Sequence, residues 1–169
     1  MTTPALRPYQ HDAVTKVEDA WHRGRRAPLL AAPTGSGKTV IACELIRRAV
    51  DRGWRVLFLA PRRELIEQAV DKLEACGIDT NVVMAGDSRR SSFARVTVAS
   101  IDTLHARRMP SGEYCILDPD LIVVDEAHLF VTPLRAGIIG HWPNAKIVGL
   151  TATPARKDGR ALALIFDER

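Results

Sequence analysis

The sequence predicts an α/β domain in which a mostly parallel sheet carries helices on both faces. Short apolar runs of strand length alternate along the chain with longer segments whose apolar residues recur at helical spacing. This alternation is typical of parallel sheets that are buried on both sides. Two segments, 32–39 and 121–128, place polar residues after apolar runs, at the position where an open parallel sheet keeps its ligand.

Six strands and their connecting helices can be placed from the pattern. Pro8 suits the first turn of a helix whose apolar residues follow helical spacing from Ala13 to Trp21. The expected strands are 28–32, 55–60, 80–85, 96–100, the run that ends at Asp125, and 146–150. The expected later helices are 39–52, 63–75, a short one at 101–107, an irregular one at 133–140 and a terminal turn at 161–166, with a surface loop at 110–119.

The composition fits one domain with an anionic partner. The chain has 169 residues, of which 46% are hydrophobic, enough for a core. A net charge of +4 and a pI near 9.2 point towards partners such as nucleic acid. Cys43, Cys76 and Cys115 show neither metal-ligand spacing nor a disulfide pattern, which predicts reduced thiols in a cytoplasmic protein. Because the sequence shows no secretory signal and no apolar run of about 18 residues, no membrane partner is expected.

The segment Ala-Pro-Thr-Gly-Ser-Gly-Lys-Thr, which starts at Ala32, has the features of a phosphate-binding loop. Its glycines let the backbone curl so that N–H groups point at phosphate oxygens, while Lys38 adds a positive charge and Thr39 a hydroxyl for Mg²⁺. The strict pattern has a glycine five residues before Gly37, where this chain has Ala32, and Gly35 supplies flexibility instead. An ordinary glycine turn is the alternative. The order of strand, glycine loop and helix favours the phosphate loop.

The second segment, Leu-Ile-Val-Val-Asp-Glu-Ala-His at 121–128, is a predicted buried strand that carries two carboxylates to its end. A carboxylate at this place can hold Mg²⁺ through water, and its neighbour can orient an attacking water. We expect Asp125 and Thr39 in the metal shell and Glu126 beside the hydrolytic water. A solvated acidic pair is the alternative for the two residues taken alone. The phosphate loop and the acidic pair support each other.

Five segments, one of them the acidic segment just described, carry a family resemblance. They are Leu-Arg-Pro-Tyr-Gln at 6–10, Ala-Pro-Arg-Arg-Glu-Leu at 60–65, Val-Ala-Ser-Ile-Asp-Thr-Leu at 98–104, Asp-Glu-Ala-His at 125–128 and Thr-Ala-Thr at 151–153. In this order they make the chain resemble the first RecA-like domain of a superfamily 2 helicase of the DEAD/DEAH-box type. The detailed wording is similar to RadD-like proteins and to the helicase portions of type I and III restriction enzymes. The resemblance covers nearly the whole chain and implies a RecA-like P-loop NTPase fold.

The resemblance implies ATP as the nucleotide and Mg²⁺ as its metal. The amide of Gln10 would pair with the adenine edge, and Arg7 would stack on or hydrogen-bond the base. A surface side chain is the alternative for Gln10. The catalytic residues would be Lys38, Asp125 and Glu126. The residues that hold the phosphates would be Pro33, Thr34, Gly35, Ser36, Gly37, Lys38 and Thr39.

The resemblance also implies a link between nucleotide hydrolysis and movement. His128 would connect the nucleotide site to Thr151 and Thr153, whose hydroxyls can exchange partners as the nucleotide state changes. A histidine at a helix start, satisfied by a backbone group, is the alternative. A metal-ligand role for His128 is disfavoured because no Cys or His partner lies at suitable spacing.

Nucleic acid, with DNA favoured over RNA, is the implied macromolecular partner. Arg62, Ser100 and Thr103 would hold its phosphates, so binding should be independent of base sequence and should fall as salt rises. For Arg62 and Arg63 the alternative is a solvated helix start. Asp102 departs from the glutamine often found in its motif, and a carboxylate at this position would repel phosphate.

Residues 1–169 accommodate one RecA-like helicase ATP-binding domain, whereas family members bind ATP between two. We therefore expect a second RecA-like domain, in cis or in trans, as a partner. Without its arginines the domain should hydrolyse ATP very slowly, because an arginine finger contributes about 10³–10⁵ in rate in other phosphate-loop enzymes. The alternative is a non-catalytic nucleotide- or nucleic-acid-binding module that regulates a partner. Glu126 argues against it, since a binding module has no need of a water-orienting carboxylate.

Overall fold

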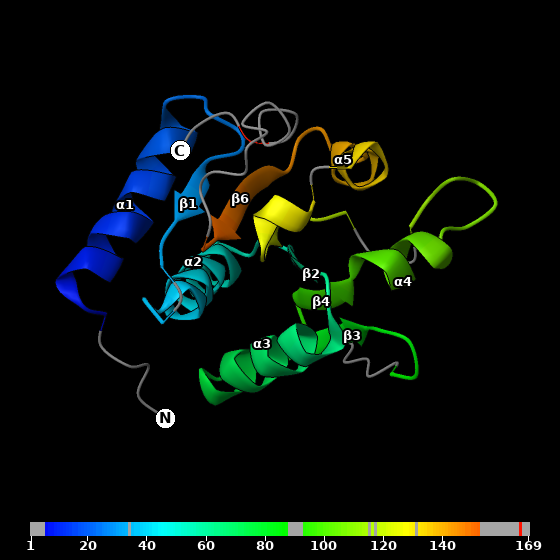
Figure 1. Ribbon diagram of the computed structural model, residues 1–169, viewed down its shortest axis with the longest axis horizontal. Helices are drawn as coiled ribbons and strands as arrows, with labels where there is room; N and C mark the ends of the chain where they lie inside the picture. The colour runs from blue at the N-terminus through cyan, green and yellow to red at the C-terminus, as the bar shows by residue number, and fades with distance from the viewer. Residues whose placement is uncertain are drawn as a thin grey trace.

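A six-stranded sheet with exclusively parallel pairings forms the centre of the molecule (Figure 1). The computed structural model describes residues 6–33, 35–87, 93–114, 116, 118–130, 132–152 and 166. The strand order is β1-β6-β5-β2-β4-β3. The strands are β1 (Leu29–Ala31), β2 (Val56–Ala60), β3 (Thr80–Val83), β4 (Val96–Ser100), β5 (Leu121–Val124) and β6 (Lys146–Thr151). The predicted parallel sheet is confirmed.

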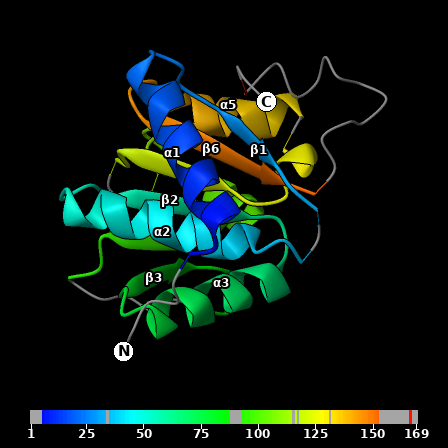
Figure 2. The same ribbon diagram turned by 90° about the vertical axis from the view of Figure 1, so that its left-hand side faces the viewer.

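Helices cover both faces of the sheet, as predicted. One core lies between the sheet and the first three helices, and a second core contains residues of the last two. Figure 2 shows α1 and α2 in front of the strands. The helices are α1 (Pro8–His22), α2 (Lys38–Asp51), α3 (Arg63–Ala75), α4 (Ile101–Ala106) and α5 (Pro133–Gly140), and a short 3-10 helix, η1 (Ala127–Leu129), follows β5.

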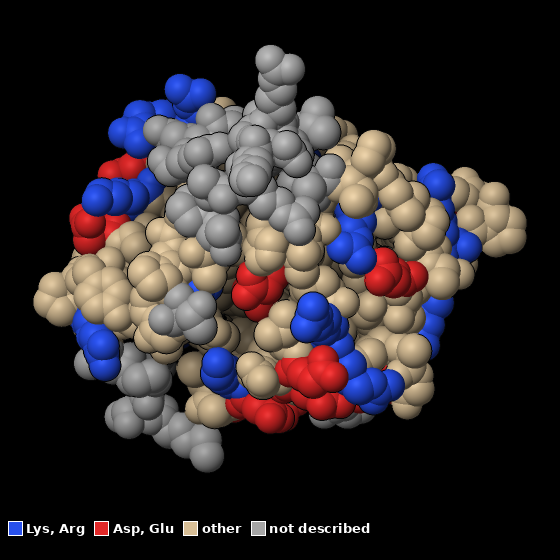
Figure 3. All heavy atoms as spheres, viewed as in Figure 1, with Lys and Arg blue, Asp and Glu red and all other residues tan. Residues whose placement is uncertain are grey.

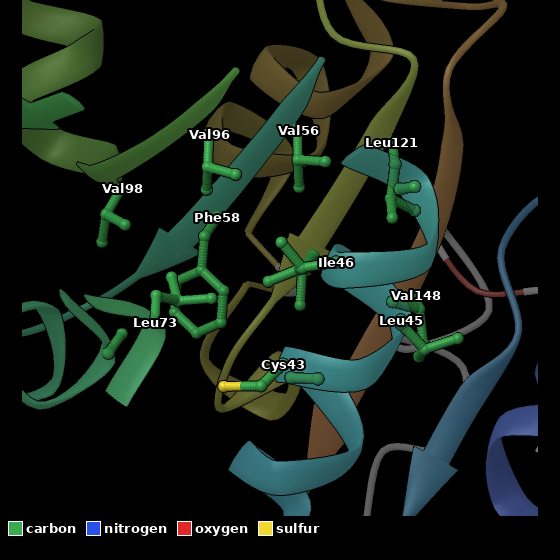
Figure 4. Packing of buried hydrophobic residues seen from close by; sticks show 14 of the residues in the cluster. Cys43, Leu45, Ile46, Val56, Phe58, Leu73, Val96, Val98, Leu121 and Val148 are labelled. Atoms are coloured by element: carbon green, nitrogen blue, oxygen red, sulfur yellow. The ribbon is translucent and has the colours of Figure 1, made fainter. Parts of the chain in front are cut away.

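Successive residues of the central strands face opposite cores, which is why these strands read as unbroken apolar runs. On β2, Val56 and Phe58 belong to the core under α2 and α3, whereas Leu57 and Leu59 belong to the core under α4 and α5. All five residues of β2 are buried. Figure 4 shows Phe58 among side chains from both the helices and neighbouring strands of its core.

Parallel register brings the carboxyl ends of the strands to one edge of the sheet. Ala60 pairs with Ser100, Val124 with Gly149, and Ala31 with Thr151. The chain leaves each of these strands towards the same edge, so the residues that follow them are neighbours in space. This edge is where the sequence placed its candidate site residues.

The observed boundaries differ little from those predicted. The predicted strand 80–85 ends at Val83, because Met84 pairs back with Asp87 through a turn in which Gly86 has a φ of 77°. The helix expected at 101–107 ends at Ala106. Of the expected terminal turn at 161–166, residues 161–165 lie outside the described residues. In the part of the chain that the structure describes, none of the helices is long and apolar enough to cross a membrane.

The indole of Trp21 connects α1 to the sheet. It is 6% exposed, and its Nε1 donates a hydrogen bond of 3.0 Å to the carbonyl oxygen of Ile147 in β6. Trp21→Phe keeps most of the ring but leaves this buried carbonyl without its donor, so we expect a loss of about 1–3 kcal/mol in the free energy of unfolding, measured with urea. Trp54→Phe is the control, because Trp54 is only partly buried. Equal losses in the two variants would contradict the structural role of this bond.

Candidate nucleotide-binding site

The glycine loop between β1 and α2 is a tight turn that exposes the start of α2. Gly35 and Gly37 both have a φ of 80°, in the left-handed region that favours glycine. The carbonyl oxygen of Pro33 accepts bonds from the N–H of Ser36 at 3.2 Å and from its hydroxyl at 2.7 Å. Gly37 is the N-cap of α2, and Thr34 lies outside the described residues. The two glycines of the described part of the loop therefore have the left-handed conformation of a tightly curled turn.

Lys38 folds back over the loop. Its Nζ donates to the carbonyl oxygens of Ala32 at 2.9 Å and of Pro33 at 3.2 Å. Both acceptors are neutral, whereas a hydrogen bond between an ammonium and a charged phosphate is about twice as strong. The ammonium group is therefore held where an arriving triphosphate can take it over.

The segment 6–10 lies against the phosphate loop. The hydroxyl of Tyr9 donates to the carbonyl oxygen of Ser36 at 2.7 Å. Gln10 is 5% exposed, and its Nε2 packs so closely on Gly37 that a Cβ there would overlap it. The Oε1 of Gln10 accepts a hydrogen bond of 2.9 Å from the backbone N–H of Arg7, and this bond caps the start of α1. Gln10 is thus buried rather than a surface side chain, while Arg7 is exposed.

The acidic pair stands immediately after β5 in a strained turn. Glu126 has a φ of 50° and a ψ of 49°, and it is the one non-glycine residue with positive φ in the described part of the chain. Its N–H donates to Oδ1 of Asp125 at 3.0 Å. Strain of this kind is concentrated at functional sites because the surrounding structure must hold it. The turn aims two successive carboxylates away from the end of one strand.

Burial raises the pKa of Asp125 above the ordinary value of an aspartate, because desolvation disfavours its charged form. The N–H of Glu126 and the positive charges of Lys38 and Lys72 act in the opposite direction, while the charge of Glu126 adds to the rise. A partly desolvated carboxylate beside the Lys38 loop is suited to a divalent cation, which would supply the missing countercharge. The donor set therefore fits the predicted Mg²⁺.

His128 joins the acidic pair to the end of β6. Its Nδ1 lies 3.2 Å from Oε2 of Glu126 and 3.2 Å from Oγ1 of Thr151, which is fully buried. A protonated Nδ1 can donate to either oxygen, whereas an unprotonated Nδ1 can only accept from the hydroxyl. One atom thus has two exchangeable partners. One of these partners, the Thr151 hydroxyl, belongs to a distant strand, so the histidine is not satisfied by a nearby backbone group alone. Thr153 lies outside the described residues.

Two residues at the site were given no role by sequence reasoning. Tyr9 belongs to the Leu-Arg-Pro-Tyr-Gln segment, so its position in a motif was the available signal. Lys72 belongs to none of the sequence motifs. Its Nζ extends from α3 and donates a hydrogen bond of 3.3 Å to Oγ1 of Thr39. Only the packing of α3 beside α2 brings this second lysine to the predicted metal-binding hydroxyl.

The predicted nucleic-acid contacts lie at the same edge of the sheet. Arg62 is the exposed N-cap of α3 directly after β2, and Ser100 is the N-cap of α4 directly after β4. The hydroxyl of Ser100 accepts from the N–H of Thr103 at 3.4 Å. Asp102 is paired with Arg135 of α5, a partner that sequence reasoning did not identify.

The fold and this site define the chain as a P-loop nucleotide-binding domain of the RecA-like type. A family model described as "Type III restriction enzyme, res subunit" matches residues 3–156. The chain therefore belongs to this family, and it is a RecA-like domain of the superfamily 2 helicase class.

Individual relatives agree with this assignment. The chain is 31% identical over 96% of its length to the "Putative mitochondrial ATP-dependent helicase irc3" of Schizosaccharomyces pombe, and 35% identical over 92% to the "Type I restriction enzyme EcoKI endonuclease subunit" of Escherichia coli. It spans 28% and 16% of the length of these relatives. Among solved structures, the Pyrococcus furiosus Hef helicase domain shares the fold with a TM-score of 0.73 at 24% identity, covering 97% of this chain and 38% of that one.

Gly37→Ala tests the contact between the phosphate loop and Gln10. The new Cβ would have an unfavourable φ and would displace the Gln10 amide. We expect a loss of more than about 1–2 kcal/mol in stability, the cost of the left-handed conformation alone, and weaker binding of a fluorescent ATP analogue. Gly53→Ala is the matched control for the backbone cost alone, because Gly53 has a φ of 81° and a Cβ there meets no atom within 4 Å. A Gly37→Ala variant that is no less stable than Gly53→Ala would rule out the predicted collision.

Asp125→Asn tests the desolvated carboxylate. Because the folded-state pKa is raised, ionisation of Asp125 costs stability as pH rises through that pKa, and the cost is absent below the pKa of the unfolded chain. Without nucleotide or divalent metal, the variant should therefore be more stable than the wild type in urea at neutral pH. The gain should shrink as the solution is made acidic. Equal stability at neutral pH would mean that desolvation does not dominate at this carboxylate.

Proposed function

We propose that the protein carrying this domain is a nucleic-acid-dependent ATPase, a DEAH-type helicase or translocase that acts on DNA in preference to RNA. The observation that carries the proposal is the shared position of His128 Nδ1, 3.2 Å from both the Glu126 carboxylate and the Thr151 hydroxyl. It connects the proposed water-orienting residue with a segment that is distant in the sequence. A protein that only bound nucleotide would not require such a link.

Each site residue would have a role in ATP binding or hydrolysis that follows from its chemistry. Lys38 would leave the carbonyl oxygens of Ala32 and Pro33 for the β- and γ-phosphates, and backbone N–H groups at the start of α2 would contact phosphate oxygens. Gln10 and Arg7 would recognise the adenine. Glu126 would accept a hydrogen bond from the attacking water and orient it towards the γ-phosphate.

Thr39 and Asp125 would hold Mg²⁺, Asp125 partly through water. When bound, the metal ion would neutralise charge on the phosphates. Two features of the chain favour this assignment: Asp125 is partly desolvated, and the ammonium of Lys72 already lies at the Thr39 hydroxyl. The ammonium would have to give way to the metal ion, because both use the same oxygen.

A nucleic-acid partner is supported by the position of Arg62, Ser100 and Thr103 at the edge that also carries the nucleotide site. DNA is favoured because one relative is a type I restriction enzyme and a structural neighbour, the restriction-modification enzyme LlaGI, was solved with a DNA substrate mimic. We further propose that a second RecA-like domain closes over the ATP and supplies the arginines that stabilise the transferred phosphate.

Substitutions in the complete protein test the proposal. The wild type should hydrolyse ATP faster when DNA is added, whereas Lys38→Ala and Glu126→Gln should lower the stimulated rate by about 10²–10⁴-fold. Lys16→Ala and Glu67→Gln are matched controls in exposed ion pairs on α1 and α3, and they should leave the rate unchanged. Parallel assays with RNA test the preference for DNA. An ATPase rate that does not respond to DNA or RNA would exclude the motor function.

A further inference from the structure

Arg135, in the first turn of α5, is fixed by three contacts. Its Nη1 donates to the carbonyl oxygen of Leu129 at 2.7 Å, and its Nη2 lies 3.3 Å from each carboxylate oxygen of Asp102. The guanidinium also lies over the ring of Phe130, 5.6 Å from its centroid. Phe130 is fully buried. The arginine is therefore held by the segment that follows the acidic pair while it faces α4.

Asp102 is the residue that conflicts with a nucleic-acid interface. Its side chain is 65% exposed, and it lies between Ser100 and Thr103, the proposed phosphate contacts. An unpaired carboxylate next to these two residues would repel a phosphate backbone, particularly at low salt. The interface is therefore usable only if the charge of Asp102 is balanced.

We propose that Arg135 is a positioning residue of the nucleic-acid interface, which neutralises Asp102 so that phosphate can approach Ser100 and Thr103. The inference rests on the proposed function, because it assumes that this edge binds nucleic acid. It assigns a role to a residue outside all of the sequence motifs, and it accounts for the aspartate that departs from the usual glutamine.

Because Arg135 is anchored, its pair with Asp102 persists when a phosphate approaches. A flexible arginine in an exposed pair would be free to exchange the carboxylate for an arriving phosphate. The Leu129 carbonyl and the Phe130 ring hold this guanidinium, which is 22% exposed. A lysine could not serve in the same way, because one ammonium lacks the planar fork that reaches carbonyl and carboxylate together.

The surrounding surface makes the local balance important. On the face seen in Figure 3, Lys and Arg side chains are interspersed with Asp and Glu and do not form one continuous basic patch. Where basic and acidic side chains alternate in this way, a single unbalanced carboxylate such as that of Asp102 would act directly on a neighbouring phosphate.

The experiment is a double-mutant cycle in the complete protein, measured as the Kd for fluorescein-labelled duplex DNA by fluorescence anisotropy. Arg135→Ala should weaken binding roughly three- to tenfold at low salt, because it exposes the Asp102 charge. Asp102→Asn alone should bind at least as tightly as the wild type. Combining the two substitutions should restore binding to about the wild-type Kd, since no carboxylate is left to neutralise.

Further readouts separate this role from a structural one. The defect of Arg135→Ala should shrink between about 50 and 200 mM salt, and it should appear in the DNA concentration for half-maximal ATPase stimulation rather than in the maximal rate. Arg52→Ala is the matched control: Arg52 pairs with Glu18 and lies over the ring of Trp54, but it stands at the far end of α2. This control should bind DNA as the wild type does.

The possible results are distinguishable. A double variant that binds as weakly as Arg135→Ala would overturn the inference, because Arg135 would then act on DNA directly or through the fold. Unchanged binding by Arg135→Ala would also overturn it while leaving the proposed motor intact. A wild-type protein that neither binds nor responds to DNA or RNA would refute the proposed function, and this inference with it.

Discussion

Parallel pairing of the six strands is the constraint on which the candidate site depends. Because all the pairings are parallel, the chain runs in the same direction through every strand, and the carboxyl ends of β1, β2, β4, β5 and β6 lie at one edge of the sheet. The phosphate loop, Arg62, Ser100, Asp125 and Thr151 lie at or just beyond these carboxyl ends. A change of register would separate them, and the two buried cores that flank the sheet hold the register in place.

Three unusual features of the described residues lie at this edge. The turn at Glu126 has a left-handed backbone, Asp125 keeps a partly desolvated carboxylate, and Gly37 leaves no room for a Cβ. The left-handed turn and the desolvated carboxylate cost free energy in the folded state, and all three features suit a site that must admit an anionic ligand and a cation. The well-packed apolar strands beneath the site supply the stability that offsets these costs.

Charge pairing at the site differs from charge pairing elsewhere. On α1 and α2, ion pairs with arginines lower the pKa values of two carboxylates. Burial raises the pKa of Glu18, but hydrogen bonds and charges from Arg52 and Arg48 lower it overall. The hydrogen bond from Arg47 is the largest cause of the lowered pKa of Glu44. The Glu18–Arg48 pair joins α1 to α2, whereas the pairs of Glu44 with Arg47 and Arg48 lie within α2. At the functional edge, by contrast, Lys38 bonds only to neutral carbonyl oxygens among its described contacts, and His128 divides one atom between two partners. Such contacts are exchangeable, which a binding site needs and a structural pair does not.

The sequence by itself determined the α/β class, nearly every element and the segments that carry the chemistry. Periodicity and glycine punctuation depend on local physics, so strands such as 96–100 and helices such as 63–75 and 133–140 are found at their predicted limits. The tertiary structure alone decided which distant side chains meet. Lys72 at Thr39, Tyr9 at Ser36, and Arg135 at Asp102 each join separate elements. No local pattern encodes these contacts, because they arise from how helices pack across the sheet.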